Sequence, residues 1–280
     1  KLFTVSALAA AVSFSLNAEE INNSPTNEAN QAVDKSKLEV IMVTAQKRVE
    51  NVQKVPVAIS VVDQEKLNAY TSSGDDIRFL SARVPSLVVE SSLGRTYPRF
   101  FIRGFGNTDF RSNASQPVEL VMDGVIQSNP NLKGFPAFDL ERIEVLKGPQ
   151  GTLFGKNTPM GAINVRTVAP SHNDSNAFIE LGVGNYGLTS FSGASSFSAI
   201  EDVLAFRVTG FGTQRDGTVS DIEHGEETMN DRNRYGARVQ ALYTPSDDLR
   251  FLFIADYSDI DEICCGVGPT ANNFQASGIP

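Results

Sequence analysis

The 280-residue chain lacks features that several classes of protein require. Beyond its N-terminus it has no run of about 18 uninterrupted apolar residues, so no membrane-spanning helix is predicted and a membrane role would have to use β-strands. It also lacks clusters of Lys and Arg, and its formal net charge is −9. Because phosphate binding depends on such clusters, nucleic acid is not a predicted partner, and cationic or neutral ligands fit better.

Catalytic and metal-binding patterns are missing as well. No Ser/His/Asp arrangement and no carboxylate pair can be placed with defined geometry, so the sequence indicates neither an enzyme nor catalytic residues. His224 lies in an acidic stretch that we interpret as a solvated loop rather than a metal site. The two cysteines, Cys264 and Cys265, are adjacent, which leaves their state open between a strained vicinal disulfide, a metal site and bonding to more distant partners.

Two glycine-rich stretches imitate nucleotide-binding loops without the required context. Gly182–Gly187 fits the dinucleotide pattern, but Leu188–Ser198 behind it alternates like a strand and offers no helix N-terminus for a pyrophosphate. Gly151–Asn157 has one spacer residue too few for a phosphate loop and ends in Asn instead of the metal-binding hydroxyl residue. The sequence therefore predicts no cofactor.

What the chain does contain begins with an export signal. Lys1 precedes the apolar run Leu2–Leu16, and the small residue Ala18 precedes an abrupt change to polar residues, which is typical of a secretory signal peptide whose start is clipped. We therefore expect residues 1–18 to be a signal peptide and the protein to be exported. Residues 19–50 are predicted to be a flexible tether, because Glu19–Lys37 has too little apolar surface to offset the entropy of ordering.

A short β-branched run, Leu38–Ala45, lies within this tether. Such a segment is suited to adding itself as a strand to the sheet edge of another protein, where backbone hydrogen bonds supply the affinity. It could equally be the first strand of the domain that follows. The residues alone leave both alternatives open.

Residues 51–169 are predicted to form a compact α+β domain. Val55–Val62 has the composition of a strand, and Asp63 caps a helix behind it. Gly74-Asp75-Asp76 opens a second helix that ends at Val84-Pro85. The long polar segment Phe105–Ser115 resembles an exposed binding loop. Further strands are expected at Leu87–Val89, Arg99–Arg103, Val118–Met122, Ile143–Leu146 and Ala162–Thr167.

Residues 170–280 alternate between apolar and polar side chains in about five strands, with Tyr near the strand ends. This pattern predicts a transmembrane antiparallel β-barrel, although a soluble β-sandwich gives the same alternation. Long connections at Asp216–Asp231 and after Ser258 contrast with short turns at Ala199–Asp202 and Thr244–Asp248, as in barrels of the outer membrane. Five strands would leave open edges in lipid, so we expect the chain to be a fragment of a longer protein.

Several motifs, taken in order along the chain, resemble those of TonB-dependent outer-membrane receptors. The segment Leu38–Ala45 resembles the TonB box. The other matching motifs are Phe101–Gly104, Val121–Val125, Ile143–Gly155 and Gly161–Val165. The resemblance implies a globular plug inside a 22-stranded barrel in the outer membrane of a Gram-negative bacterium. It also implies uptake that TonB energises from the proton gradient of the inner membrane.

The resemblance also assigns roles to individual positions. Arg103 and Lys147 match two plug cations that face barrel carboxylates, which would lie beyond Pro280; Lys147 stands where the family usually has Arg. The segment expected to pair with TonB consists of Val40, Ile41, Met42, Val43 and Thr44. Ligand is expected at the plug apex, at Asn107, Asp109, Phe110, Arg111 and Asn113.

The resemblance implies active transport of a scarce nutrient. A ferric siderophore is the first expectation by family frequency, with cobalamin or an oligosaccharide as alternatives. The implied partners are TonB, outer-membrane lipid and the small ligand. Two rivals are a signalling receptor, which in this family uses an extra folded N-terminal domain that Glu19–Lys37 is too short to form, and an exported soluble binding protein.

Overall fold

The computed structural model describes residues 41–71, 76–91, 95, 97–109, 111, 113–134, 136–221 and 225–263. The predicted signal peptide and the tether as far as Val40 lie outside these residues, as do Phe110, His224, Cys264 and Cys265. Within the described part of the chain, none of the helices has the length and apolar character needed to cross a membrane.

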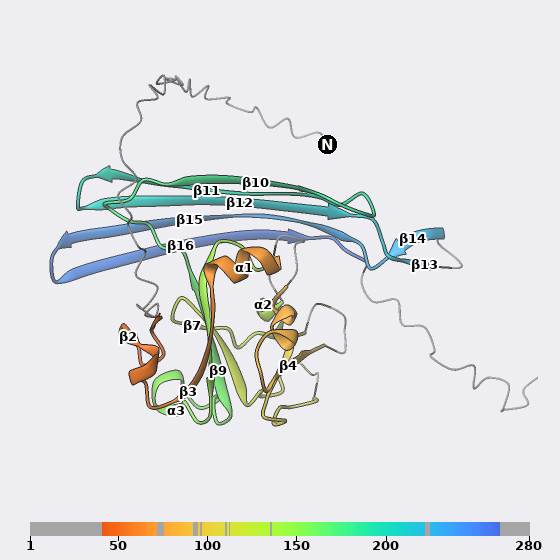
Figure 1. Ribbon diagram of the computed structural model, residues 1–280, viewed down its shortest axis with the longest axis horizontal. Coiled ribbons are helices and arrows are strands. Elements are labelled where there is room, and N and C mark those ends of the chain that lie inside the picture. Colours follow the sequence, from red (N-terminus) through yellow and green to blue (C-terminus); the bar gives the residue numbers. More distant parts are fainter. Residues whose placement is uncertain are drawn as a thin grey trace, which may run out of the picture. The chain divides into compact units, whose positions relative to one another are not determined.

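The α+β domain is built on a five-stranded mixed sheet with the strand order β3-β8-β9-β6-β7 (Figure 1). Neighbouring strands are antiparallel except for the parallel pair β6 and β9. The strands are β3 (Ala58–Asp63), β8 (Leu140–Lys147), β9 (Gly161–Thr167), β6 (Val118–Met122) and β7 (Val125–Ile126). The strands predicted in this domain are therefore present, with bounds that differ by a few residues.

Two helical segments and a hairpin cover the first face of this sheet. Helix α1 (Gln64–Thr71) begins behind Asp63, whose carboxylate accepts a hydrogen bond from the Lys66 amide, as predicted. The second predicted helix is instead a 3₁₀ helix, η2 (Ile77–Ala82), and the Asp76 side chain caps its start at the Arg78 amide. Beside them, β4 (Leu87–Glu90) and β5 (Arg99–Ile102) form an antiparallel pair.

The N-terminal residues of the described chain cover the second face. They form β1 (Met42–Val43), β2 (Glu50–Asn51) and the 3₁₀ helix η1 (Val52–Lys54). Val43, Ala45 and Val55 pack in one apolar cluster with side chains of the sheet and its loops, namely Val121, Leu146, Phe154 and Ala162. The sheet is thus buried on both faces, and accordingly β8 is buried without a break from Ile143 to Leu146.

Short helices and tight turns complete the domain. Asp123 and Gly124 both have positive φ values, 47° and 86°, and close the β6–β7 hairpin. At Gly161 a Cβ atom would lie 2.3 Å from the Leu146 carbonyl oxygen, so only glycine fits where β9 meets β8. The remaining helices are α2 (Pro130–Lys133) and α3 (Gly151–Phe154).

A second five-stranded sheet, here called the wall sheet, follows the α+β domain. Its strands pair antiparallel in the order β10-β11-β12-β15-β16, and the hairpin of β13 and β14 is inserted between β12 and β15 (Figure 1). The strands are β10 (Ala177–Val183), β11 (Thr189–Ile200), β12 (Leu204–Arg215), β13 (Val219–Asp221), β14 (Gly225–Met229), β15 (Arg232–Ser246) and β16 (Leu249–Ile260).

Burial in the wall sheet is inverted relative to a soluble protein. Along β15, Arg238 and Gln240 are buried, whereas Tyr235 and Val239 on the opposite face are about half exposed. On β10, Ile179 is 82% exposed. The predicted combination of an apolar outer face and a polar inner face is therefore confirmed, together with the α+β domain and antiparallel strands of the predicted fold class.

Candidate functional site

The segment Ile41–Ala45, here called the docking segment, lies against the α+β domain. Its strand β1 pairs antiparallel with β2, with Met42 opposite Asn51 and Val43 opposite Glu50. The side chains of Val43 and Ala45 are completely buried, whereas Ile41 and Met42 are exposed. The sequence left open whether this segment adds to the sheet of another protein or forms the first strand of the domain that follows. In this structure it forms the first strand of the domain.

A buried carboxylate binds the middle of the docking segment. Glu144 on β8 accepts hydrogen bonds at Oε1 from the Thr44 amide at 2.7 Å and from the Thr44 hydroxyl at 3.1 Å. Arg142 Nε donates to the same oxygen at 2.7 Å, and Asn164 Nδ2 donates to Oε2 at 3.0 Å. The docking segment is thus held by polar contacts at Thr44 as well as by apolar burial on either side of it.

The two predicted latch cations, Arg103 and Lys147, lie within electrostatic range of each other. Burial lowers the pKa of Lys147, and the positive charge of Arg103 lowers it further. Among the residues that the structure describes, neither cation has a carboxylate partner. Their predicted role in a latch with the barrel thus stays a prediction.

A different contact joins the α+β domain to the wall sheet. Asp139, which precedes β8 and has a φ of 50°, accepts hydrogen bonds from Arg207 Nε at 2.7 Å and Arg207 Nη2 at 2.5 Å. The hydroxyl of Thr209 donates to the same carboxylate at 2.6 Å. The Asp139 and Arg207 side chains are 1% and 3% exposed, so this forked ion pair is shielded from water.

Next to this ion pair, aromatic and amide contacts extend the same junction. Phe138 stacks on Phe211 with ring centroids 4.2 Å apart, and the Arg238 guanidinium lies 4.4 Å from the Phe138 centroid. Gln240 Nε2 donates to the Thr167 hydroxyl at 2.8 Å. The inward-facing polar residues of the alternating strands were the sequence signal for this junction, but they did not identify their partners.

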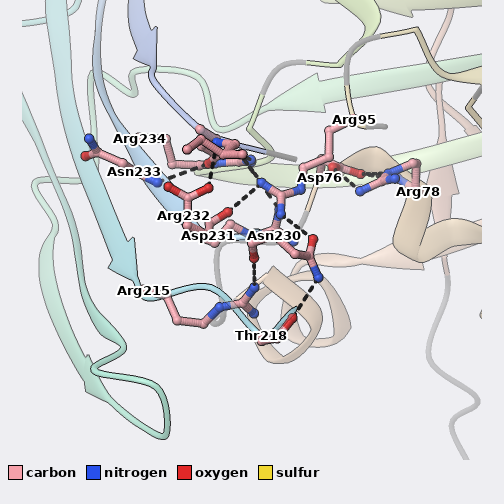
Figure 2. Close-up of polar contacts among 12 residues, drawn as sticks. Asp76, Arg78, Arg95, Arg215, Thr218, Asn230, Asp231, Arg232, Asn233 and Arg234 are labelled. Atoms are coloured by element: carbon pink, nitrogen blue, oxygen red, sulfur yellow. Dashed lines mark hydrogen bonds and ion pairs between the residues drawn. The ribbon is translucent and has the colours of Figure 1, made fainter. Parts of the chain in front are cut away.

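A cluster of arginines, here called the arginine cluster, joins the loop at Arg95 to the ends of β15 and β16 (Figure 2). It consists of Arg95, Arg232 and Arg234 around Glu262. Arg95 contacts Glu262, and it also donates to the Asp231 carbonyl and to Asn230 Oδ1, both at 2.7 Å. Arg234 forms a fork on Glu262 at 2.5 and 2.6 Å.

Electrostatics in the arginine cluster follow from its burial. Burial raises the pKa of Glu262, but hydrogen bonding and charge from Arg234, together with Arg95 and Arg232, outweigh it and leave the pKa below its ordinary value. Burial lowers the pKa of Arg95, against the opposing effect of Glu262. The carboxylate is therefore held ionised by its cationic neighbours.

The predicted ligand loop is shaped by contacts within itself. Arg111 donates three hydrogen bonds to the Asp109 carboxylate from its guanidinium and a fourth from its amide, and these bonds lower the pKa of Asp109 to about 2. Asn107 accepts from the Asp109 amide at 2.9 Å and donates to the Ser115 carbonyl at 2.8 Å. Asn113 is exposed in the same loop.

An open cavity of about 300 Å³ adjoins this loop, lined by Asn107, Ser115, Lys156 and Asn157 among others. Binding of ligand by these residues stays a prediction. In the described ranges, no group of three or more His, Cys, Asp or Glu side chains is placed to hold a metal ion.

Comparison with known proteins assigns this arrangement to a class. Residues 51–162 match the family model of the TonB-dependent Receptor Plug Domain. The α+β domain is thus a plug domain, and the wall sheet is the antiparallel sheet that accompanies it. The matched residues carry the plug domain of TonB-dependent receptors, and the relatives described next are receptors and transporters.

Individual relatives cover much of the chain but are considerably longer. The chain is 29% identical over 152 residues to the Vitamin B12 transporter BtuB of Vibrio vulnificus (strain CMCP6), covering 52% of this chain and 23% of that protein. It is 28% identical over 177 residues to the Ferrioxamine receptor of Yersinia enterocolitica, covering 61% and 22%. The chain thus spans about a quarter of the length of these curated relatives.

Solved structures show the same fold. The ferric yersiniabactin uptake receptor FyuA from Yersinia pestis superimposes with a TM-score of 0.65 at 24% identity, covering 72% of this chain and 31% of that one. The alcaligin outer membrane receptor FauA from Bordetella pertussis gives a TM-score of 0.60 at 18% identity, covering 79% and 35%.

Proposed function

We propose that the protein carries out TonB-dependent active transport of a ferric siderophore across the outer membrane of a Gram-negative bacterium. The observation that carries the proposal is the docking segment, a strand held on a plug domain by contacts that can be released. Relatives named as the Ferrioxamine receptor and the Ferrichrome outer membrane transporter/phage receptor support an iron chelate as the ligand.

The exposed face of the wall sheet supports a membrane location. Leu181 and Phe253 on this face are 77% and 61% exposed, which is costly in water but favourable in lipid. Aromatic side chains pair toward the strand ends, as Tyr235 with Tyr257 and Tyr243 with Phe251. Such pairs suit the two membrane interfaces, where aromatic girdles flank the apolar band of a barrel.

The proposed mechanism assigns a part to each segment. Residues 1–18 direct export, 19–50 carry the segment that pairs with TonB, 51–169 form the plug and 170–280 begin the barrel. Ligand binds at the plug apex near Asn107, Asp109 and Arg111, and TonB pairs with Val40–Thr44 and pulls on the plug. Arg103 and Lys147 face barrel carboxylates and help to hold the plug in place.

Deletion of Leu38–Ala45 tests this mechanism in the full-length receptor. Cells carrying the deletion are expected to bind radiolabelled ferrioxamine or ferrichrome at the surface as wild type does, but to lose energised uptake, because the strand that TonB pairs with is gone. Unchanged uptake by the deletion variant would sink the mechanism.

A second candidate ligand is cobalamin, because the Vitamin B12 transporter of Vibrio vulnificus is among the relatives. Uptake of cyanocobalamin and of the two iron chelates by a receptor-deletion strain, with and without the restored full-length receptor, separates the candidates. Restored uptake of cyanocobalamin alone would favour this second candidate.

A further inference from the structure

A carboxylate lies in the middle of an apolar sheet face. Glu144 is completely buried, and it lies opposite Asn164 in the register of β8 and β9. Leu146, Ala162 and Val121 on the same face belong to the apolar cluster that packs on the docking segment. A buried carboxylate is costly unless hydrogen bonds satisfy it, so its contacts indicate what this position is built to hold.

Those contacts converge on one residue of the docking segment. Glu144 accepts from both the amide and the hydroxyl of Thr44, and the same hydroxyl lies 3.3 Å from Arg142 Nη2 and 3.3 Å from Asn164 Nδ2. The hydroxyl thus donates to the carboxylate and accepts from two donors. In the docked position its full hydrogen-bonding capacity is therefore used.

The side chains that bind Thr44, here called the seat, are those of Glu144, Arg142 and Asn164, and they also contact one another. Arg142 Nε and Asn164 Nδ2 bind the two oxygens of Glu144 at 2.7 and 3.0 Å, independently of the docking segment. The carboxylate is therefore oriented before the segment arrives, and little side-chain entropy is lost on docking.

We propose that Glu144 is the positioning residue that holds the docking segment on the plug, with Arg142 and Asn164 orienting its carboxylate. The strength of the contact between Glu144 and Thr44 then sets how often the segment is free to pair with a partner strand. A partner that adds this segment to its sheet needs the backbone groups of the segment. Here the Thr44 amide is bound to Glu144, and β1 is paired with β2. Docking and pairing with a partner therefore compete. The identity of the partner rests on the proposed function, whereas docking does not.

Labelling of a buried cysteine measures undocking directly. In the full-length receptor, with Cys264 and Cys265 replaced by serine, Val43→Cys places a thiol at a position that is fully buried when the segment is docked. A maleimide then reacts only with the undocked state. Ile41→Cys, at an exposed position, supplies the reference rate for an accessible thiol.

Glu144→Gln keeps the size of the side chain but removes its charge and presents an NH₂ group among donors. It is expected to raise the Val43→Cys labelling rate at least about tenfold, the effect of losing one hydrogen bond to a charged group. The matched control is Glu119→Gln, since Glu119 is an equally buried carboxylate in β6 whose ion-pair partner, at 2.8 Å, is Lys133 and not a residue of the docking segment. Its labelling rate is expected to equal that of wild type.

Two Thr44 variants test the seat without changing the plug. Thr44→Val removes the hydroxyl but keeps the amide bond to Glu144, so it is expected to raise labelling by less than Glu144→Gln, and Thr44→Ser is expected to restore the wild-type rate. Because Thr44→Val leaves every plug contact of Glu144 in place, it also decides the matter if Glu144→Gln fails to fold.

The proposal would be overturned if Glu144→Gln and Thr44→Val both left the labelling rate of Val43→Cys at its wild-type value. It would also be overturned if Glu119→Gln raised that rate as much as Glu144→Gln does. Labelling uses no TonB, so the result does not depend on the proposed function. A separate binding measurement with the purified periplasmic domain of TonB tests that function. Increased labelling without any TonB binding would support the seat and contradict the transporter.

Discussion

The Arg207 guanidinium of β12 donates two hydrogen bonds, at 2.7 and 2.5 Å, to the Asp139 carboxylate of the plug. Both side chains are buried, and Thr209 and Ser196 complete their hydrogen bonding. The polarity is opposite to that of the latch predicted from Arg103 and Lys147, because here the plug supplies the anion and the wall supplies the cation. The plug is therefore attached to the wall sheet through the residue that directly precedes β8.

Asp139→Asn tests the strength of this attachment. Asparagine tolerates the left-handed backbone at this position, so the variant removes the charge with little added strain. Because Arg207 is left as a buried charge without its carboxylate, the free energy of unfolding is expected to fall by about 3–5 kcal/mol. Calorimetric or denaturant unfolding of the purified receptor measures the change.

Asp202→Asn is the matched control for this variant. Asp202 also has a positive φ, 57°, but it is exposed in the turn between β11 and β12. The same substitution there is expected to change stability by no more than about 0.5 kcal/mol. Equal effects at both positions would show that the backbone, and not the ion pair, determines the loss at Asp139.

The arginine cluster is expected to weaken in acid. The pKa of Glu262 lies below its ordinary value of 4.5 in the folded protein, so the stabilising contribution of its carboxylate is fully present above pH 4.5 and is lost as the pH falls through the lowered pKa. Cleavage near Arg95 by an acid-active protease should therefore accelerate at low pH, and Glu262→Gln should be cleaved quickly at every pH. A wild-type profile in Glu262→Gln would contradict this role.

The ligand loop carries its own test. Asp109 is expected to titrate at about 2 instead of 3.8, because Arg111 stabilises the ionised form. Arg111→Gln should return the pKa of Asp109 toward 3.8. Chemical-shift titration of the Asp109 carboxyl carbon measures both values, and an ordinary pKa in the wild-type receptor would show that the Asp109–Arg111 contact is absent in solution.

Introducing a charged residue on the exposed face of the wall sheet tests whether this face contacts lipid or water. Val239 lies on this face between the inward-facing residues Arg238 and Gln240. If the face contacts lipid, Val239→Arg near the middle of the membrane is expected to cost about 2–4 kcal/mol, whereas Asn233→Arg near the strand end should cost about 0–1 kcal/mol. Folding into lipid vesicles, followed by heat-modifiable gel migration, gives both values. Equal, small effects would favour a soluble sandwich.

The strand pattern was the part of the fold that the sequence could predict. Period-two alternation placed β15 and β16 and identified which face of each is polar, because the pleat fixes that relation locally. The same alternation puts Arg207 and Gln240 on the polar faces of their strands, but it does not identify their partners in the plug. Asp139 lies 68 residues before Arg207, and no local rule connects them.

The docking segment shows the same limit. Its β-branched composition predicted a strand, but composition does not say which sheet receives it. The deciding interaction is between Thr44 and Glu144, which are 100 residues apart in the chain.

The most direct test of the transport account is uptake of radiolabelled ferrioxamine and ferrichrome by cells that carry the full-length receptor, with and without TonB. If transport depends on TonB, the cell surface binds equal amounts in both strains and only the strain that has TonB accumulates the chelates inside. Equal accumulation without TonB would contradict it.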